Sequence, residues 1–199
     1  MNPLTTHLWL QYFMISKRRV ESLGRFLTAL LRHTPEAANL DMDKQGWVSV
    51  SQLVNNTQNN EKPTCLEEII EVVQRDDKDR FGLKVENDDT YIRCKQGHNG
   101  RLGLELKFDT PAPPETLFHG YPSHIEAEIL EKGLVAMDRS HVHLSKDIKT
   151  ALSVAKRHGE PMYMVVHSGR MVRDGLSLYL SDNNVWLADS VPPEYLTRP

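Results

Sequence analysis

The chain has 199 residues, of which 39% are hydrophobic and 26% charged, and its formal net charge is −3. This composition is typical of a soluble globular protein with one large or two small domains, and it argues against nucleic-acid binding through overall charge. Cys65 and Cys94 lie far apart and in no Cys-x-x-Cys pair, so the sequence predicts neither a disulfide framework nor a zinc knuckle.

An apolar run, Leu8-Trp-Leu-Gln-Tyr-Phe-Met-Ile15, lies near the start of the chain. It is much shorter than the roughly 20 residues that cross a bilayer. The basic cluster Lys17-Arg-Arg19 follows it, which is the wrong order for a secretory signal. We therefore expect a cytoplasmic protein without a membrane segment, with residues 1–19 as an N-terminal extension.

Apolar residues recur at helical spacing, which predicts a helix that ends at the Thr34-Pro35 step. They are Leu23, Phe26, Leu27, Leu30 and Leu31. Arg32 and His33 then lie at the C-terminal end of this helix. Five cations and one anion, Glu21, fall between Lys17 and His33. This basic patch either meets an anionic polymer or is a solvated helix face.

The next segment alternates short strands with helices. Residues 46–50 are predicted as a strand, and a capping box, Thr64-x-x-Glu67, opens a helix over 66–73. Strands are predicted at 81–85 and 91–94, with a turn between them. Helices followed by a two-stranded ribbon suggest a winged-helix module, which we place at residues 20–110.

Pro111, Pro113 and Pro114 are typical of a stiff connection between domains. Beyond them, residues 111–199 form a second predicted lobe. Its expected strands lie at 117–120, 138–145, 162–166, 176–180 and 185–187, and its helices at 123–133 and 147–158. Many short strands with two helices indicate an α+β lobe with a split β-sheet.

Within the predicted strand 138–145, polar side chains alternate with apolar ones. Arg139, His141, His143 and Ser145 share one face of an extended strand, and Val142 and Leu144 take the other. The polar face is either a functional site or a solvated sheet face. A metal site on His141 and His143 is a further alternative that needs a third ligand.

Four cationic or titratable residues lie at the ends of predicted elements, namely Arg32, His33, Arg80 and Arg139. The arginine fork matches phosphate oxygens bidentately, so several arginines at one point would make a phosphate site. The sequence alone does not establish that they converge.

Several sequence blocks carry a family resemblance: Leu30-Leu-Arg-His-Thr-Pro35, Leu40 to Val48, Asp77-Lys-Asp-Arg-Phe81, Gln96-Gly-His98, Phe118-His-Gly120, Arg139 to Ser145, and Val185-Trp-Leu187 with Val191-Pro192. In this order they resemble the RNA 2'-phosphotransferase family, NAD-dependent enzymes known from tRNA splicing. The resemblance extends from about Gly24 to Leu196.

The resemblance implies a fold and a reaction. The fold is α+β, with a winged-helix-like, RNA-binding N-terminal lobe and an ADP-ribosyltransferase-like C-terminal lobe that binds NAD. In the reaction, an internal 2'-phosphate of a tRNA-like RNA attacks the nicotinamide-bearing ribose carbon of NAD, and the ribose 2''-hydroxyl then attacks the phosphorus. The products are 2'-hydroxyl RNA, nicotinamide and ADP-ribose 1'',2''-cyclic phosphate. NAD is the co-substrate, no metal is needed, and we expect a monomer.

By this resemblance, Arg32, His33, Arg80 and Arg139 match the family's catalytic Arg-His-Arg-Arg set. The arginines would grip the 2'-phosphate and stabilise the charge that builds on phosphorus. His33 would donate a hydrogen bond or act as acid or base for the ribose hydroxyl.

The resemblance also indicates cofactor-binding residues on the second lobe and on the segment between the lobes. Gly120 is expected to let the backbone approach NAD closely, and His141 has no assigned role. The candidates for cofactor binding are His119, Gly120, His143, Ser145, Gln96 and His98.

Three positions depart from the family pattern. Tyr121 replaces a small hydroxyl residue and adds bulk beside the expected nicotinamide site, and Asn99 replaces a serine. Asn184 replaces a glycine, which asparagine's tolerance of the left-handed conformation accommodates.

Two other functions remain open at this point. One is an ADP-ribosyltransferase that acts on RNA ends or protein and omits the second step. The other is a winged-helix regulator that senses NAD or ADP-ribose without turnover. All four catalytic positions are filled, which favours the complete reaction.

Overall fold

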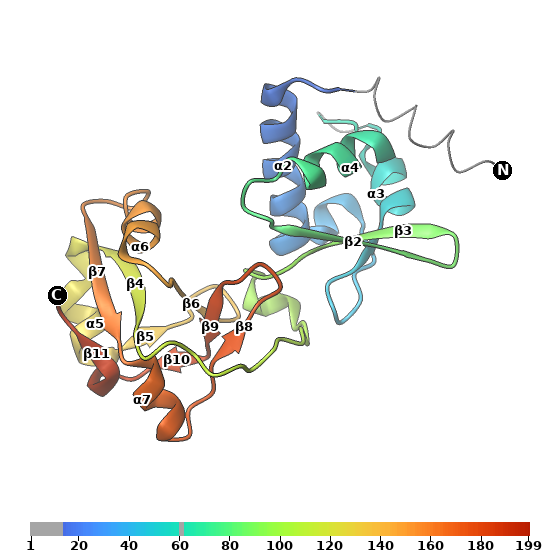
Figure 1. The fold of residues 1–199 in the computed structure, drawn as a ribbon. Helices are drawn as coiled ribbons and strands as arrows, with labels where there is room; N and C mark the ends of the chain where they lie inside the picture. The colour runs from blue at the N-terminus through green and yellow to red at the C-terminus, as the bar shows by residue number, and fades with distance from the viewer. Residues whose placement is uncertain (1–13, 60–61) are drawn as a thin grey trace. The chain divides into compact units, whose positions relative to one another are not determined.

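The computed structural model describes residues 14–59 and 62–199, which divide into two compact units (Figure 1). The first unit runs to His98 and includes Leu102–Leu106, and the second contains Asn99–Arg101 and Lys107–Pro199. The mixture of helix and sheet confirms the α+β class. The winged-helix and ADP-ribosyltransferase assignments of the lobes stay predictions.

Most of the predicted N-terminal extension, residues 1–13, lies outside the described residues. Its last three residues belong to a helix, because α2 already begins at Lys17. In the described part of the chain, no helix has the length and apolarity needed to cross a membrane.

The first unit contains helices and a small antiparallel sheet in which β3 is the central strand. Its elements are α2 (Lys17–Arg32), a 3₁₀ turn (Pro35–Ala38), β1 (Val48–Ser49), α3 (Val50–Thr57), α4 (Leu66–Gln74), β2 (Phe81–Glu86) and β3 (Asp89–Cys94).

Helix α2 forms as the sequence predicts. The side chain of Ser16 caps it by accepting a hydrogen bond from the backbone N–H of Arg19. Its apolar stripe, including Leu23, Leu27 and Leu31, is fully buried in the core of the unit. The helix ends before Thr34, where Pro35 prevents its continuation.

The predicted capping box of α4 is wrong. The cap residue is Cys65, without a side-chain hydrogen bond, and the Thr64 hydroxyl bonds to the Cys65 carbonyl instead. The helix is held by tertiary packing, since Ile69 and Val72 are buried against the core.

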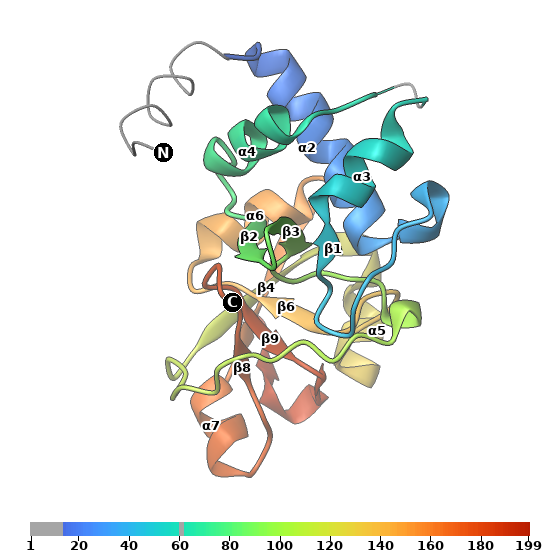
Figure 2. The same ribbon diagram turned by 90° about the vertical axis from the view of Figure 1, so that its right-hand side faces the viewer.

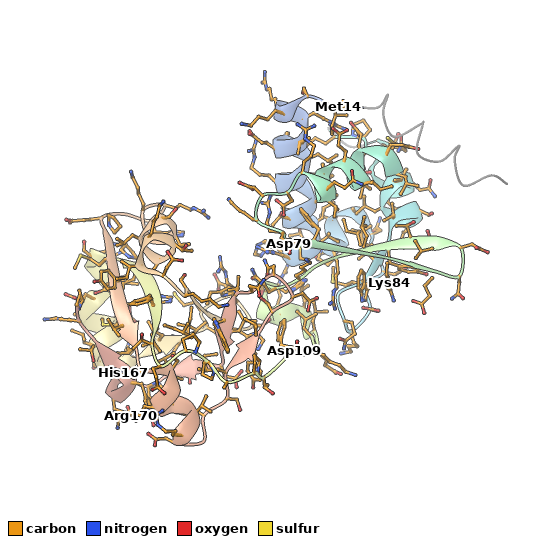
Figure 3. The ribbon with its side chains drawn as sticks, in the orientation of Figure 1. Met14, Asp79, Lys84, Asp109, His167 and Arg170 are labelled. Carbon is orange, nitrogen blue, oxygen red and sulfur yellow. The ribbon has the colours of Figure 1, made fainter. Side chains whose placement is uncertain are left out.

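Helices α2, α3 and α4 lie on one side of the three-stranded sheet in both ribbon views (Figures 1 and 2). Alternate strand residues, such as Phe81 and Ile92, point to this side and join the core. Figure 3 labels Lys84 of β2. Its ammonium lies over the rings of Trp47 and Tyr91, on the side of β2 opposite the core.

The second unit is built from short antiparallel strands and small helices. Its elements are β4 (Leu117–Pro122), α5 (Glu126–Lys132), β5 (Leu134–Val135), β6 (Val142–Leu144), α6 (Ile148–Ala155), β7 (Pro161–Val166), α7 (Ser168–Arg173), β8 (Tyr179–Leu180), β9 (Trp186–Ala188), β10 (Ser190–Val191) and β11 (Leu196–Thr197).

These strands form three sheets, with orders β11-β7-β4, β6-β9-β8 and β10-β5. Helix α6 packs against β4 and β7 (Figure 1). A backbone bridge joins Phe118 of β4 to Ser145, through hydrogen bonds of 2.8 and 2.9 Å. This bridge brings the residues that follow β6 beside β4.

Several expectations for this unit need correction. The strand predicted over 138–145 covers only Val142–Leu144, with isolated bridges at Arg139 and Ser145. The predicted helix at 123–133 begins as a 3₁₀ turn, and α5 itself starts at Glu126 without the expected Ser123 cap. Helix α7 and the two-residue strands β5, β10 and β11 were not predicted from the sequence.

Candidate active site

Arg32 occupies the last position of α2, and its guanidinium is packed against the backbone of Gly97. A Cβ added at Gly97 would lie 3.1 Å from Arg32 Cζ, and Gly97 has a left-handed φ of +82°. Arg32 Nε and Nη2 are shielded from solvent and have no hydrogen-bond partner among the described residues. Because shielded guanidinium nitrogens normally carry partners, this geometry suits an anionic ligand.

Arg80 lies immediately before β2 and is held by Asp76. The Asp76 carboxylate accepts hydrogen bonds from Nε, Nη2 and the backbone N–H of Arg80, and its side chain is only 1% exposed. Burial raises the pKa of Asp76, but the hydrogen bonds and charge of Arg80 outweigh this and lower it below its usual value. The pair therefore keeps Arg80 charged and fixed in direction.

The pKa values of Cys94 and His98 show which cations lie near them. Burial raises the pKa of Cys94 to about 11, and both Arg32 and Arg80 oppose that rise. Burial also lowers the pKa of His98 to about 4, helped by Arg32, Arg93 and His33. In the first unit, Arg32 and Arg80 therefore both lie near the unreactive Cys94 thiol, and Arg32 and His33 both lie near His98.

The second unit contains a pocket of about 590 Å³, within the usual range for small-molecule sites. Arg139, His141, His143 and Ser145 all line it. The four residues expected on one face thus line one pocket, but Val142, expected on the other face, lines it too, and the regular strand covers only Val142–Leu144. Residues of β4 and α6 also line the pocket, among them His119, Gly120 and Ala151.

Two histidines of the pocket have defined ring orientations. His119 Nδ1 donates to the backbone carbonyl of His143, and His143 Nδ1 donates to that of His141, each at 3.0 Å. Burial lowers the pKa of His119, and Arg139 lowers it further. Since its Nδ1 is the donor, a neutral His119 carries a lone pair on Nε2, which can accept a hydrogen bond from a hydroxyl group.

Gly120 has a packing role that the sequence did not reveal. A Cβ at this position would lie 1.9 Å from the backbone carbonyl oxygen of Ala151, in α6. Glycine is therefore required so that α6 can approach β4, whatever the pocket binds.

The three departures from the family pattern each have a structural account. Tyr121 lines the pocket but is only 1% exposed, because it packs in the core of the unit and its hydroxyl donates to Glu126 at 2.9 Å. Asn99 bridges Arg139 through its backbone and accepts from the N–H of Arg101. Asn184 has a φ of 61°, which confirms the expected left-handed conformation.

His141 packs edge-on against two aromatic rings, with centroid distances of 5.5 Å to Phe108 and 5.7 Å to Tyr179. Its Nε2 is 3.7 Å from Asp189, and burial lowers its pKa despite that carboxylate. Within residues 14–59 and 62–199, no three His, Cys, Asp or Glu side chains are grouped as a metal site requires.

The structure assigns Gln96 and His98 to the first unit, where both are buried. They are not among the residues that line the pocket of the second unit. Sequence reasoning missed Asp76 as the partner of Arg80 and Gly97 as the support of Arg32. The only available signals were the i, i+4 spacing of Asp76 and Arg80 and the glycine beside Gln96.

An arginine-rich region in one unit and a histidine-lined pocket in the other are typical of a protein that binds an anionic substrate and a second ligand. The sequence profile of "RNA 2'-phosphotransferase, Tpt1 / KptA family" matches residues 17–190. The chain therefore belongs to this family.

Individual relatives agree over nearly the whole chain. A "Probable RNA 2'-phosphotransferase" of Flavobacterium johnsoniae is 42% identical over 176 residues, covering 88% of this chain and 94% of the relative. A protein of the same description from Rhodopirellula baltica is 41% identical over 186 residues, covering 94% of this chain and all of the relative.

Proposed function

We propose that the protein removes an internal 2'-phosphate from RNA by transferring it to NAD. The phosphate oxygen forms a bond to the ribose C1'' carbon as the bond to nicotinamide breaks. The ribose 2''-hydroxyl then attacks the phosphorus, losing its proton, and the RNA 2'-oxygen leaves and is protonated. The products are 2'-hydroxyl RNA, nicotinamide and ADP-ribose 1'',2''-cyclic phosphate.

The observation that carries this proposal is the state of Arg32. Its guanidinium is supported by Gly97, and two of its shielded nitrogens have no partner among the described residues. Folding a cation into this position is unfavourable unless an anion binds there. A dianionic phosphate held by Arg32 and Arg80 satisfies that requirement and is the nucleophile the reaction needs.

The pocket of the second unit fits NAD in size and in chemistry. Its volume lies in the range of cofactor sites, and the Nε2 of His119 offers an acceptor for a ribose hydroxyl. Ser145 and His143 add further polar groups to the lining of the pocket. NAD would supply the electrophilic ribose carbon and the leaving nicotinamide.

The remaining residues have distinct tasks under this proposal. Asp76 keeps Arg80 oriented and charged, so that the guanidinium needs no reorganisation during the reaction. Arg139, which lines the pocket, stabilises the charge on phosphorus in the second step. His33 is exposed and moves the proton of the ribose hydroxyl.

The test uses an oligonucleotide with one internal 2'-phosphate, incubated with the protein with and without NAD. We expect 2'-hydroxyl RNA and one equivalent of nicotinamide, both only when NAD is present. Dephosphorylation that is independent of NAD would contradict the proposal. Absence of any product would contradict it as well.

Arg139→Ala separates the two chemical steps. We expect this variant to accumulate ADP-ribosylated RNA, because loss of the guanidinium impairs the attack on phosphorus. Accumulation of the same species by the unmodified protein would favour an ADP-ribosyltransferase that stops after the first step. Normal turnover by the variant would remove Arg139 from the proposed mechanism.

A further inference from the structure

A groove of about 690 Å³ lies in the first unit, between α2 and the turn that follows α4. Five cations line it, namely Lys17 and Arg25 from α2 and Arg75, Lys78 and Arg80 from the turn. Two anions, Glu21 and Asp77, also line it. This local excess of positive charge contrasts with the net charge of −3 of the whole chain.

The cations of the groove differ in their surroundings. Arg75 is paired with Glu71, and Arg80 is paired with Asp76. Lys17, Arg25 and Lys78 are exposed, as is Arg75, and all of them line the groove. An exposed row of this kind attracts polyanions and contributes little to folding stability.

The groove is continuous with the proposed phosphate site. Arg80 belongs to both, and its Nη2 lies 3.6 Å from the Cβ position of Gly24 on α2. Lys17, Arg25 and Arg32 fall on one face of α2, because they are separated by eight and seven residues. At 1.5 Å per residue, Arg25 lies about 10 Å and Lys17 about 22 Å along the helix from Arg32.

We propose that this groove binds the RNA strand next to the 2'-phosphate, through contacts of Lys17, Arg25 and Lys78 with backbone phosphates. The inference rests on the proposed function, since it takes Arg32 and Arg80 as the site of the 2'-phosphate. RNA binding by the groove also explains the basic patch of α2, because Lys17 and Arg25 have no role in the proposed chemical steps. Contacts to the RNA backbone position a substrate without reading its sequence.

The experiment compares two RNAs that each carry one internal 2'-phosphate. One is a dinucleotide, and the other is extended on both sides to about ten nucleotides, within the range that single-strand grooves cover. The variant Lys17→Gln/Arg25→Gln removes two charges from the groove. The control Arg18→Gln/Lys44→Gln removes two charges from exposed positions of the same unit that do not line it.

We expect the groove variant to lower kcat/KM for the long RNA about tenfold at low salt, and to change the dinucleotide value by less than about twofold. The slope of log affinity against log salt for the long RNA should fall by about 1.4, because each phosphate contact to a single strand contributes about 0.7. The control variant should keep both the long-RNA preference and the slope.

Two results would overturn the groove proposal. One is an unchanged ratio of long to short kcat/KM in the groove variant, and the other is an equal loss in the control variant. If neither RNA is turned over by the unmodified protein, the proposed function fails by itself. In that case the affinity for the long RNA is measured by fluorescence anisotropy. The groove proposal is then tested by comparing the slope of log affinity against log salt between the groove variant and the control variant.

Discussion

The two units bear different kinds of polar site. In the first unit the important groups are permanent cations, with Arg80 held by a buried carboxylate and Arg32 supported by a glycine. In the second unit they are the imidazoles of His119 and His143, whose rings are oriented by backbone carbonyls, and burial lowers the pKa of His119. The first arrangement suits recognition of charge, and the second suits recognition of hydroxyl groups and shape.

The variant Arg32→Met tests the charge-recognition role of the first unit and has the largest expected effect. We expect activity on 2'-phosphorylated RNA to fall about 10²- to 10³-fold, as when a transition-state donor is lost. The free energy of unfolding should rise by up to about 1 kcal/mol, because shielded nitrogens without a partner are removed. Steady-state kinetics and urea unfolding measure the two effects.

Arg18→Met is the matched control for that variant, since it removes an exposed arginine from the same helix. It should leave both quantities nearly unchanged. Arg32→Lys should fail to restore activity, because lysine lacks the bidentate fork. An active Arg32→Met protein would show that Arg32 does not bind the phosphate.

In the second unit the largest expected effect is on folding. Gly120→Ala places a Cβ 1.9 Å from a backbone oxygen of α6, so we expect a loss of about 3 kcal/mol in the free energy of unfolding. Gly82→Ala is the control, because its Cβ would make only an ordinary 3.5 Å contact with Trp47. Equal stability of the two variants would refute the packing role of Gly120.

Gly97→Ala tests whether the backbone supports Arg32. Both this variant and Gly103→Ala put alanine at a left-handed position, which costs about 1–2 kcal/mol each. Only Gly97→Ala also presses on the guanidinium, so only this variant should lose activity, by about tenfold or more. Comparable activity of the two alanine variants would leave Gly97 without a role in positioning Arg32.

The smallest expected effect concerns His98. Its folded pKa of about 4 lies below the unfolded value of 6.5, so the unfolded state binds more protons between these limits. The stability that neutral His98 contributes is present above pH 6.5 and is lost as the pH falls towards 4. Between pH 7 and 5.5 the loss is about 1 kcal/mol.

Urea unfolding of the protein and of His98→Gln over this pH range measures the contribution. The variant should show a flatter dependence of unfolding free energy on pH. Identical pH profiles would mean that His98 is not held neutral by its surroundings.

Elements with a strong periodic signal were predictable from the sequence. The leucine stripe of α2 and the β2 and β3 ribbon formed as expected, because local periodicity and core burial agree there. Arg139 and His143 line one pocket, as a shared face requires, although the strand is short and Val142 of the other predicted face lines the pocket as well.

The failures have a common physical cause. The cap expected from Thr64 did not form because tertiary packing, not capping, decides where α4 begins. The two-residue strands β5, β10 and β11 exist only through pairing with distant segments, which local sequence does not encode. Likewise, the need for Gly120 comes from Ala151, thirty-one residues away in the sequence.

The central claim is that the phosphate moves to NAD and is not released by hydrolysis. The most direct measurement labels the internal 2'-phosphate of an RNA with ³²P and follows the label through a single turnover with the intact protein. The account predicts that the label appears in ADP-ribose 1'',2''-cyclic phosphate. Label in inorganic phosphate, or label that remains on the RNA, would contradict it.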